Sequence, residues 1–127
     1  MCIRDRYNTT ATSTDPSYVI RIAELYLIRA EARAQQNNLS GALADLNAIR
    51  ARAGVPNATV TSQAAILQAI EDENSVEFAF EPHRWFDLVR TGRAGAVLGL
   101  TNQNYWLFPI PLSDILSDPD VTQNPGY

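Results

Sequence analysis

The chain has 127 residues, enough for one domain, and its 46% hydrophobic and 19% charged content is typical of a globular protein. Ten basic and fourteen acidic residues give a net charge of −4, and no cluster of Lys and Arg predicts a surface for nucleic acid. No apolar run approaches the roughly 20 residues needed to cross a bilayer.

The opening residues differ in composition from everything that follows. Residues 1–6 are discontinuous with the rest, and we predict that they are a non-native start. Residues 7–17 are rich in Ser and Thr, which predicts a solvated polar linker. Cys2 is the only cysteine, so no disulfide forms within the chain, and it is a poor lipidation site because no signal stretch precedes it.

The first predicted helix spans 18–35. A second apolar stripe, made of Leu25, Ile28 and Ala32, runs beside its main stripe, so we expect this helix to be covered on two sides. Its main stripe repeats at steps of three and four: Ile20, Ala23, Leu27, Ala30 and Ala34.

A second helix is predicted over 39–53, with Asn38 or Ser40 as its N-cap and Gly54 just beyond its end. A short polar turn joins it to the first helix, so the two should form an antiparallel hairpin that resembles one tetratricopeptide unit. A single unit cannot bury its outer face, so neighbouring elements are implied.

Two further helices and a long irregular tail complete the predicted all-α fold. Thr61 or Ser62 should cap a third helix that reaches about Phe80, and Pro82 suits the first turn of a short fourth helix that ends at Gly92. We predict that Ala65, Ala69, Val76 and Phe80 line one side of the third helix and that Ile66, Leu67, Ile70 and Phe78 broaden its apolar surface. Beyond Gly92 only Ser113–Leu116 indicates a turn of helix, and Tyr105 to Pro111 is predicted to be extended.

Five segments, in order, resemble the motifs of the SusD/RagB family. Residues 21–32 resemble Arg-x-Ala-Glu-x-Tyr-Leu-x-x-Ala-Glu-Ala, and residues 46–54 match Leu-Asn-x-Ile-Arg-x-Arg-Ala-Gly. Residues 77–90 resemble Glu-Phe-x-Phe-Glu followed by Arg-Trp-x-Asp-Leu-x-Arg. Residues 109–111 and 123–127 match the closing Pro-Ile-Pro and Gln-Asn-Pro-Gly-Tyr motifs. One departure is Glu73-Asn74, where the family usually has Glu-Arg.

The resemblance implies that residues 18–127 are the C-terminal helical domain of a longer, non-catalytic binding protein. Members of this family are surface lipoproteins that bind oligosaccharides or other nutrients and cap a SusC-like, TonB-dependent transporter in the outer membrane. The resemblance therefore implies an outer-membrane location, with the lipid anchor in a region upstream of this chain. It implies no cofactor and no nucleic-acid partner.

No residue is predicted to be catalytic. Glu73, Glu77 and Glu81 share one helical face, and paired carboxylates can act as the acid and base of a glycosidase. Carboxylates on adjacent turns lie side by side, however, and not on opposite faces of a sugar. We therefore interpret the charged motif residues as a structural network between helices: Arg21, Glu24, Glu31, Arg50, Arg52, Glu77, Glu81, Arg84, Asp87 and Arg90.

The remaining candidate chemistry is sparse. His83 is the only histidine, and with no Cys nearby we predict no metal site and an exposed imidazole near the start of the fourth helix. Neither a Gly-x-Ser-x-Gly elbow nor a glycine-rich phosphate loop is present.

The segment 101–106 combines amides with aromatic rings, which is the composition of a sugar site. Its weak ligand-binding candidates are Asn102, Asn104, Tyr105 and Trp106. The interpretation we favour is that Tyr105, Trp106 and Phe108 seal the helices beneath the tail and that the family's ligand contacts lie upstream. We also expect the segment to lack a fixed shape without an upstream scaffold.

Two other classes of protein fit parts of the pattern. A tetratricopeptide-like adapter would bind a peptide in an open groove, but it predicts further copies of the hairpin, and no second copy is visible. A small hydrolase predicts a convergent nucleophile or an acid–base pair, which the sequence lacks.

Overall fold

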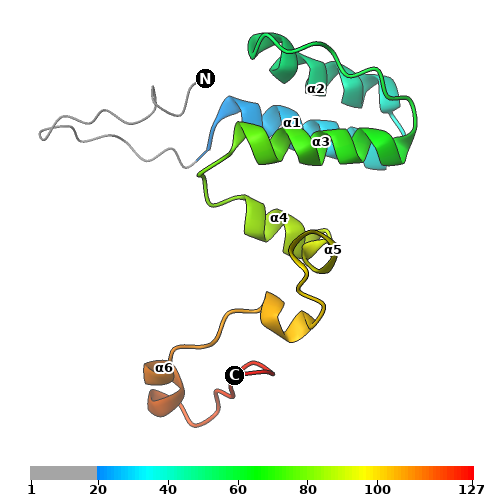
Figure 1. Ribbon diagram of the computed structural model, residues 1–127. Coiled ribbons are helices and arrows are strands. Elements are labelled where there is room, and N and C mark those ends of the chain that lie inside the picture. The colour runs from blue at the N-terminus through cyan, green and yellow to red at the C-terminus, as the bar shows by residue number, and fades with distance from the viewer. Residues whose placement is uncertain (1–19) are drawn as a thin grey trace, which may run out of the picture. The chain divides into compact units, whose positions relative to one another are not determined.

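The computed structural model describes residues 20–127, and every regular element in that range is a helix (Figure 1). This confirms the all-α prediction. The chain divides into two compact units, Met1–Ala79 and Phe80–Tyr127. The predictions of a non-native start and a polar linker over 1–17 lie outside the described residues. None of the described helices is long and apolar enough to cross a membrane.

The first unit contains the predicted hairpin and the helix that packs against it. These helices are α1 (Ile22–Gln35), α2 (Leu39–Arg52) and α3 (Gln63–Glu77). The predicted caps are present: the side chains of Asn38 and Ser62 accept hydrogen bonds from the backbone N–H groups of Gly41 and Ala65. Gly54 follows α2 with φ 71°, a left-handed conformation that glycine adopts at low cost.

Alanines at the contact between α1 and α2 let the two helices approach closely. Leu27, Leu46, Ile66 and Ile70 fill the space between the three helices, and complete burial of such a side chain contributes roughly 1.5–3 kcal/mol. The small residues in this core are all fully buried: Ala23, Ala30, Ala34 and Ala42. The core thus combines small contact residues with a few large ones, as close packing requires.

Only one side of α1 is covered within residues 20–127. Leu25 and Ile28, which belong to its second apolar stripe, are 50% and 54% exposed. Ile20 was expected to begin the buried stripe, but it is exposed because α1 begins two residues later, at Ile22. Of the two sides of this helix that were predicted to be covered, only the side with the main stripe is covered among the described residues.

Only part of the apolar surface predicted for α3 is buried. Val76 and Phe80 are 74% and 81% exposed, whereas Ile66, Ile70 and Glu73 point into the core. The isoleucines bury more apolar area than Ala65 and Ala69 would, so the helix turns that face inward. Its end was also misplaced, because α3 stops at Glu77 and Phe80 has φ 66°.

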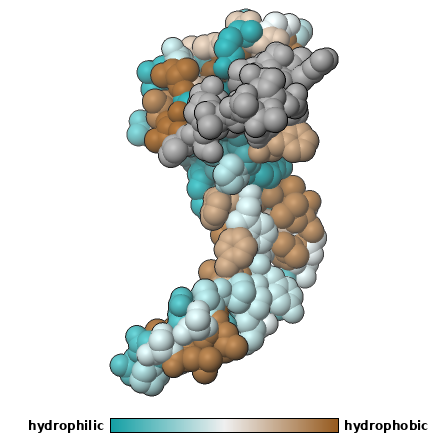
Figure 2. All heavy atoms as spheres, turned by 90° about the vertical axis from the view of Figure 1, so that its left-hand side faces the viewer, coloured by the Kyte–Doolittle hydropathy of each residue, from teal (hydrophilic) through white to brown (hydrophobic). Residues whose placement is uncertain are grey.

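The second unit begins with the predicted fourth helix, α4 (Arg84–Arg90). Pro82 does not lie in its first turn, because His83 is the N-cap and Pro82 precedes it. Gly92 follows the helix with φ 71°, as its predicted end. Exposed apolar side chains are also found in this unit, and brown surface is visible over it in Figure 2.

The tail is more regular than predicted. It contains α5 (Ala94–Leu98), a 3₁₀ helix (Gln103–Trp106) and α6 (Leu112–Ser117). The last of these confirms the turn predicted near Ser113. Tyr105 and Trp106 are helical and not extended, because the side chain of Asn102 accepts from the backbone of Asn104 and begins a turn there. Elements of four to six residues are too short to show a hydrophobic period.

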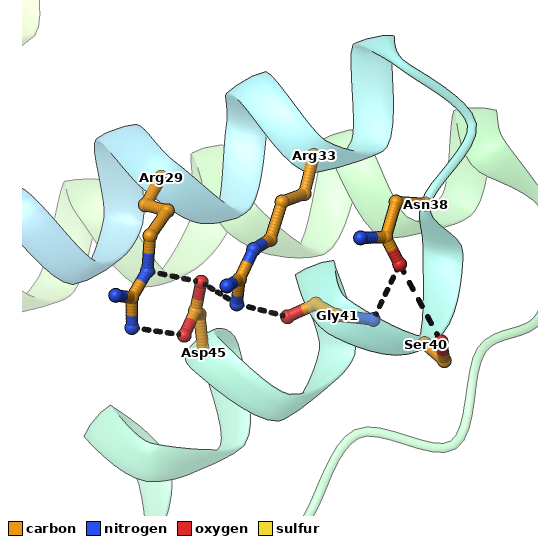
Figure 3. A network of polar contacts seen from close by, with 6 residues as sticks. All are labelled: Arg29, Arg33, Asn38, Ser40, Gly41 and Asp45. Atoms are coloured by element: carbon orange, nitrogen blue, oxygen red, sulfur yellow. Dashed lines mark hydrogen bonds and ion pairs between the residues drawn. The ribbon is translucent and has the colours of Figure 1, made fainter.

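One buried carboxylate holds α1 and α2 together (Figure 3). The side chain of Asp45 on α2 is 5% exposed. It accepts two hydrogen bonds from Arg29, at 2.9 Å from Nε and 2.7 Å from Nη2, and a third from Nη1 of Arg33 at 2.7 Å. Nη1 of Arg33 also donates to the carbonyl of Gly41, at 3.3 Å. The hydrogen bond with Asp45 raises the pKa of Arg29 above its ordinary value.

We predict that Asp45→Asn lowers the free energy of unfolding by about 2 kcal/mol, because the amide loses the charge and one acceptor oxygen while the arginines lose their partner. Urea denaturation measures this change. Asp72→Asn is the matched control, since Asp72 is exposed on α3 and should change stability by less than about 0.5 kcal/mol. Equal effects of the two substitutions would contradict the role given to Asp45.

Candidate functional site

The charged motif residues of the first unit form ion pairs between helices. Glu77, at the end of α3, accepts from Nη1 of Arg21 at 2.8 Å and also pairs with Arg52 of α2. Arg21 donates in addition to the backbone carbonyl of Glu77, at 2.9 Å, and its guanidinium lies over the ring of Phe78. One carboxylate thus links the chain before α1 to the ends of α2 and α3.

Glu73, one turn earlier, has its own partner. It accepts from Nη1 of Arg50 at 2.7 Å, and Nε of the same arginine donates to the carbonyl of Pro56 at 2.9 Å. Arg50 therefore ties α2, the following loop and α3 together. Glu73 and Glu77 thus pair with arginines, whereas Glu81, predicted to share their helical face, lies beyond the end of α3.

The electrostatics of Glu77 differ from those of a catalytic acid. Burial tends to raise its pKa, but the hydrogen bonds from Arg52 and Arg21 outweigh burial and hold the pKa below its usual value. The acid of a glycosidase needs a raised pKa and room for a sugar beside it. The side chain of Glu77 is instead 8% exposed and is occupied by two arginines.

The charged residues of the second unit are arranged around α4. Oδ1 of Asp87 accepts from Nε of Arg90 at 2.9 Å, a pair within the helix. The carboxylate of Glu81 is almost fully buried, and Nε2 of His83 lies 3.8 Å from its Oε2. The prediction of an exposed imidazole was wrong, because the N-cap position holds His83 beside Glu81 and half-buries it.

The three remaining residues of the predicted network lie on α1 and α4. Glu24 and Glu31 are half-buried on α1, and Arg84 is half-buried at the start of α4. Their structural role stays a prediction. Among residues 20–127, no group of three His, Cys, Asp or Glu side chains is arranged to hold a metal ion.

The four weak ligand-binding candidates divide into two pairs. Nε1 of Trp106 donates to the carbonyl of Leu100 at 2.9 Å, and its ring lies against Gly95 of α5. The side-chain oxygen of Asn102 accepts from the backbone of Asn104 at 3.1 Å. These groups serve the fold. Tyr105 and the side chain of Asn104 remain exposed.

The closing residues of the chain hold the extended segment 107–111 by side-chain hydrogen bonds. The amide of Gln123 bonds Ile110 in both directions, accepting from its N–H at 2.8 Å and donating to its carbonyl at 3.0 Å. Asn124 donates to the carbonyl of Phe108 at 2.7 Å, and the hydroxyl of Tyr127 donates to the carbonyl of Leu107 at 3.0 Å. We call these three residues, Gln123, Asn124 and Tyr127, the C-terminal clasp.

The clasp supplies hydrogen-bond partners to a segment in which two prolines prevent regular strand pairing. Pro109 and Pro111 have no N–H and cannot form a regular strand ladder. The remaining carbonyls and the N–H of Ile110 still need partners, and the side chains of the clasp supply them. The neighbouring segment 101–106, which we expected to lack a fixed shape without an upstream scaffold, contains a capped 3₁₀ helix in this structure.

Aromatic contacts fix the same segment from two sides. The ring of Phe108 lies 5.7 Å from that of Trp85 on α4, tilted by 47°. The rings of Tyr105 and Tyr127 lie 6.4 Å apart at 75°, an edge-to-face arrangement. Phe108 and Trp106 therefore contact α4 and α5, although Phe108 is still 62% exposed, whereas Tyr105 packs against Tyr127. That these aromatic residues seal the helices stays a prediction.

Sequence reasoning missed Asp45, Gln123 and Tyr127. A signal for Asp45 was present: it interrupts the buried face of α2 one residue before Leu46, and two arginines lie four residues apart on α1. A lone acid on a buried face predicts a cationic partner. The contacts of Gln123 and Tyr127 join residues 13 and 20 positions apart through side-chain-to-backbone bonds, which leave no periodic signal.

Comparison with known proteins agrees with the resemblance of the motifs. Residues 3–101 match the SusD family. The starch-binding protein SusD of Bacteroides thetaiotaomicron is 37% identical over 121 residues, covering 86% of this chain and 21% of that protein. SusD-like protein P25 of Formosa agariphila is 31% identical, covering 90% of this chain and 25% of that protein. The chain therefore spans about a fifth to a quarter of these relatives.

Solved structures show the same relationship in three dimensions. A SusD-like protein from Bacteroides fragilis superposes with a TM-score of 0.74 at 29% identity, covering 85% of this chain and 25% of its own. A SusD superfamily protein from Parabacteroides distasonis gives a TM-score of 0.76 at 31% identity, with 94% and 29% covered. The helical arrangement described above is therefore one that larger proteins of this kind contain.

The lowered pKa of Glu77 predicts how its contribution to stability depends on pH. Its folded pKa lies below the unfolded value near 4.5, so ionised Glu77 stabilises the fold above that pH, and the contribution is lost as pH falls through the folded pKa. The stability difference between wild type and Glu77→Gln should therefore be largest at neutral pH and shrink below pH 4.5. Denaturation at a series of pH values tests this, and a difference independent of pH would contradict it.

The clasp predicts a local effect of Gln123→Ala. Loss of both hydrogen bonds to Ile110 should speed amide exchange of Ile110 about tenfold, which corresponds to roughly 1–1.5 kcal/mol, and leave the amides of α1 to α3 unchanged. Gln103→Ala is the matched control, since Gln103 is exposed on the 3₁₀ helix. Hydrogen exchange followed by NMR measures both variants, and unchanged exchange at Ile110 would show that the amide bonds do not hold the segment.

Proposed function

This chain belongs to the SusD family, and we propose that it is the C-terminal helical part of a protein that binds oligosaccharides or related nutrients without chemically altering them. The observation that carries this proposal is the family match over residues 3–101. It is supported by a relative, 37% identical, whose name describes it as starch-binding.

We propose that the protein is not catalytic because its acidic side chains are engaged in ion pairs. The side chains of Asp45, Glu73 and Glu77 are almost fully buried, and each accepts a hydrogen bond from at least one arginine. Removing the acid from such a pair leaves the arginine without a partner, which destabilises the fold. We therefore interpret these acids as structural. A hydrolase would instead need an acid and a base facing an open site.

The partner and location in this proposal come from the family resemblance. The complete protein would lie at the cell surface, anchored to the outer membrane by a lipid on an upstream region. It would cap a TonB-dependent, SusC-like transporter and deliver its ligand to it. The exposed apolar stripe of α1, with Leu25 and Ile28, supports the view that this chain packs against an upstream helical scaffold.

The alternative is a tetratricopeptide-like module that binds a protein. The hairpin of α1 and α2 favours it, since small buried residues such as Ala30 and Ala42 bring the helices close, as in such repeats. The further helices of the described chain do not repeat this hairpin: α3 packs as a single helix, and the second unit is built from shorter elements. The SusD-like function is therefore preferred.

We predict that the complete protein binds soluble oligosaccharides and releases no reducing ends from them. The 127-residue chain alone should bind none of them more tightly than about 100 μM, roughly −5.5 kcal/mol, because the main contacts lie upstream. Calorimetric titration against a panel of soluble glycans and a reducing-end assay measure both properties. Cleavage of any glycan, or lack of binding to the whole panel by the complete protein, would overturn the proposal.

A further inference from the structure

We propose that Tyr105, Tyr127 and the side chain of Asn104 form an auxiliary contact site for one pyranose ring of a neutral oligosaccharide. The proposal rests on the proposed function, because it assumes that a glycan is brought to this protein. It differs from the sequence-based candidates. Asn102 and Trp106 are replaced by Tyr127, which only the fold brings to this place.

The two tyrosine rings are half-exposed although they touch each other. Tyr105 is 49% exposed and Tyr127 is 54% exposed, and their rings meet edge to face. This arrangement leaves aromatic surface open to solvent. We call the two side chains the tyrosine pair. An aromatic ring of this kind can stack on the apolar C–H face of a pyranose.

Polar groups suited to sugar hydroxyls lie next to the tyrosine pair. The side-chain amide of Asn104 makes no hydrogen bond to any residue in the range 20–127, and neither does the hydroxyl of Tyr105. An amide can donate to one hydroxyl and accept from another, and a phenol can do the same. The site therefore combines a stacking surface with donors and acceptors at its edge, as sugar binding requires.

The backbone holds these groups in place before any ligand arrives. Gly126 has φ 102° and lies directly against the turn, where a Cβ would be 3.1 Å from Cβ of Asn104 and 3.7 Å from Cε1 of Tyr105. Only glycine fits this position without strain. The hydroxyl of Tyr127 is fixed on the carbonyl of Leu107. Binding therefore does not need to order the rings, which lowers its entropic cost.

The lack of charged side chains in the segments that carry the site favours one class of glycan. Residues 94–113, which contain the turn, include no Asp, Glu, Lys, Arg or His, and residues 121–127 include none either. An acidic sugar would find no cationic side chain in these segments to offset the desolvation of its carboxylate or sulfate. A neutral hexopyranose pays no such cost, so neutral oligosaccharides are the ligands that this site fits.

NMR titration of the 127-residue chain tests the site directly. Cellohexaose, maltohexaose and xylohexaose are the neutral probes, and hexagalacturonate is the acidic probe. With at least one neutral probe at millimolar concentration, shift changes should be confined to the rings of the tyrosine pair and the side-chain amide of Asn104. No change at about 20 mM of every neutral probe, or changes centred elsewhere, would overturn the proposal, as would an equal response to hexagalacturonate.

Variants of the complete protein separate this site from the main one. Tyr105→Ala should weaken hexasaccharide binding about fivefold, which is the fold-change expected for loss of one aromatic contact, and leave disaccharide binding unchanged. Tyr105→Phe keeps the ring and should lose less than Tyr105→Ala. Phe86→Ala is the control, since Phe86 is an exposed aromatic residue on α4 away from the turn in sequence. The shifts of the wild-type chain provide a test that does not depend on how any variant folds.

The two proposals fail in different ways. If the complete protein binds hexasaccharides and Tyr105→Ala binds them with wild-type affinity, the tyrosine pair is only an anchor for the C-terminus, and the auxiliary site is wrong while the proposed function stands. If the complete protein binds no glycan but the tyrosine pair in the isolated chain responds to a neutral probe, the site is supported and the proposed function fails.

Discussion

The first unit depends on the burial of one carboxylate. Asp45 lies on the face of α2 that packs against α1, where an unpaired charge would be costly. Arg29 and Arg33 satisfy it from successive turns of α1, and this fixes the register of one helix against the other. The alanines around it could tolerate several registers by size alone. The three charge-assisted hydrogen bonds to Asp45, by contrast, can form in only one register.

The same pattern repeats where α3 joins the hairpin. In each case the acid is buried and the arginine reaches it from the rim: Glu73 is bonded to Arg50, and Glu77 is bonded to Arg21 and Arg52. Arginine suits this position, because its apolar stem covers the core while its guanidinium stays partly hydrated. The hydrogen bonds from Arg52 and Arg21 lower the pKa of Glu77, which stabilises its ionised form and makes it a poor proton donor. The features that make this face resemble an acid–base site in the sequence are thus the features that make it structural.

The sequence predicted what local chemistry determines and failed where distant side chains decide. The hairpin and its caps at Asn38 and Ser62 follow from periodicity and from the free N–H groups at a helix start. Periodicity could not identify the inner face of α3, because two apolar stripes coexist in its sequence. Packing against α1 and α2 determines that Ile66 and Ile70 are the buried ones. The shape of the tail could not be predicted either. It depends on Gln123, whose amide contacts the backbone of a residue 13 positions earlier.

The two units are therefore stabilised by different means, and the second unit can leave more aromatic surface exposed. In the first unit, large side chains such as Leu27 and Leu46 are buried in the core and are not available at the surface. In the second, only Leu88 and Ala94 are buried, and the fixed path of the tail comes from side-chain hydrogen bonds to its backbone. Because the clasp supplies that order, aromatic rings in the tail need not be buried to hold it. Tyr105 and Tyr127 can thus be both rigid and exposed, a combination that a hydrophobic core does not provide and that recognition of a sugar face requires.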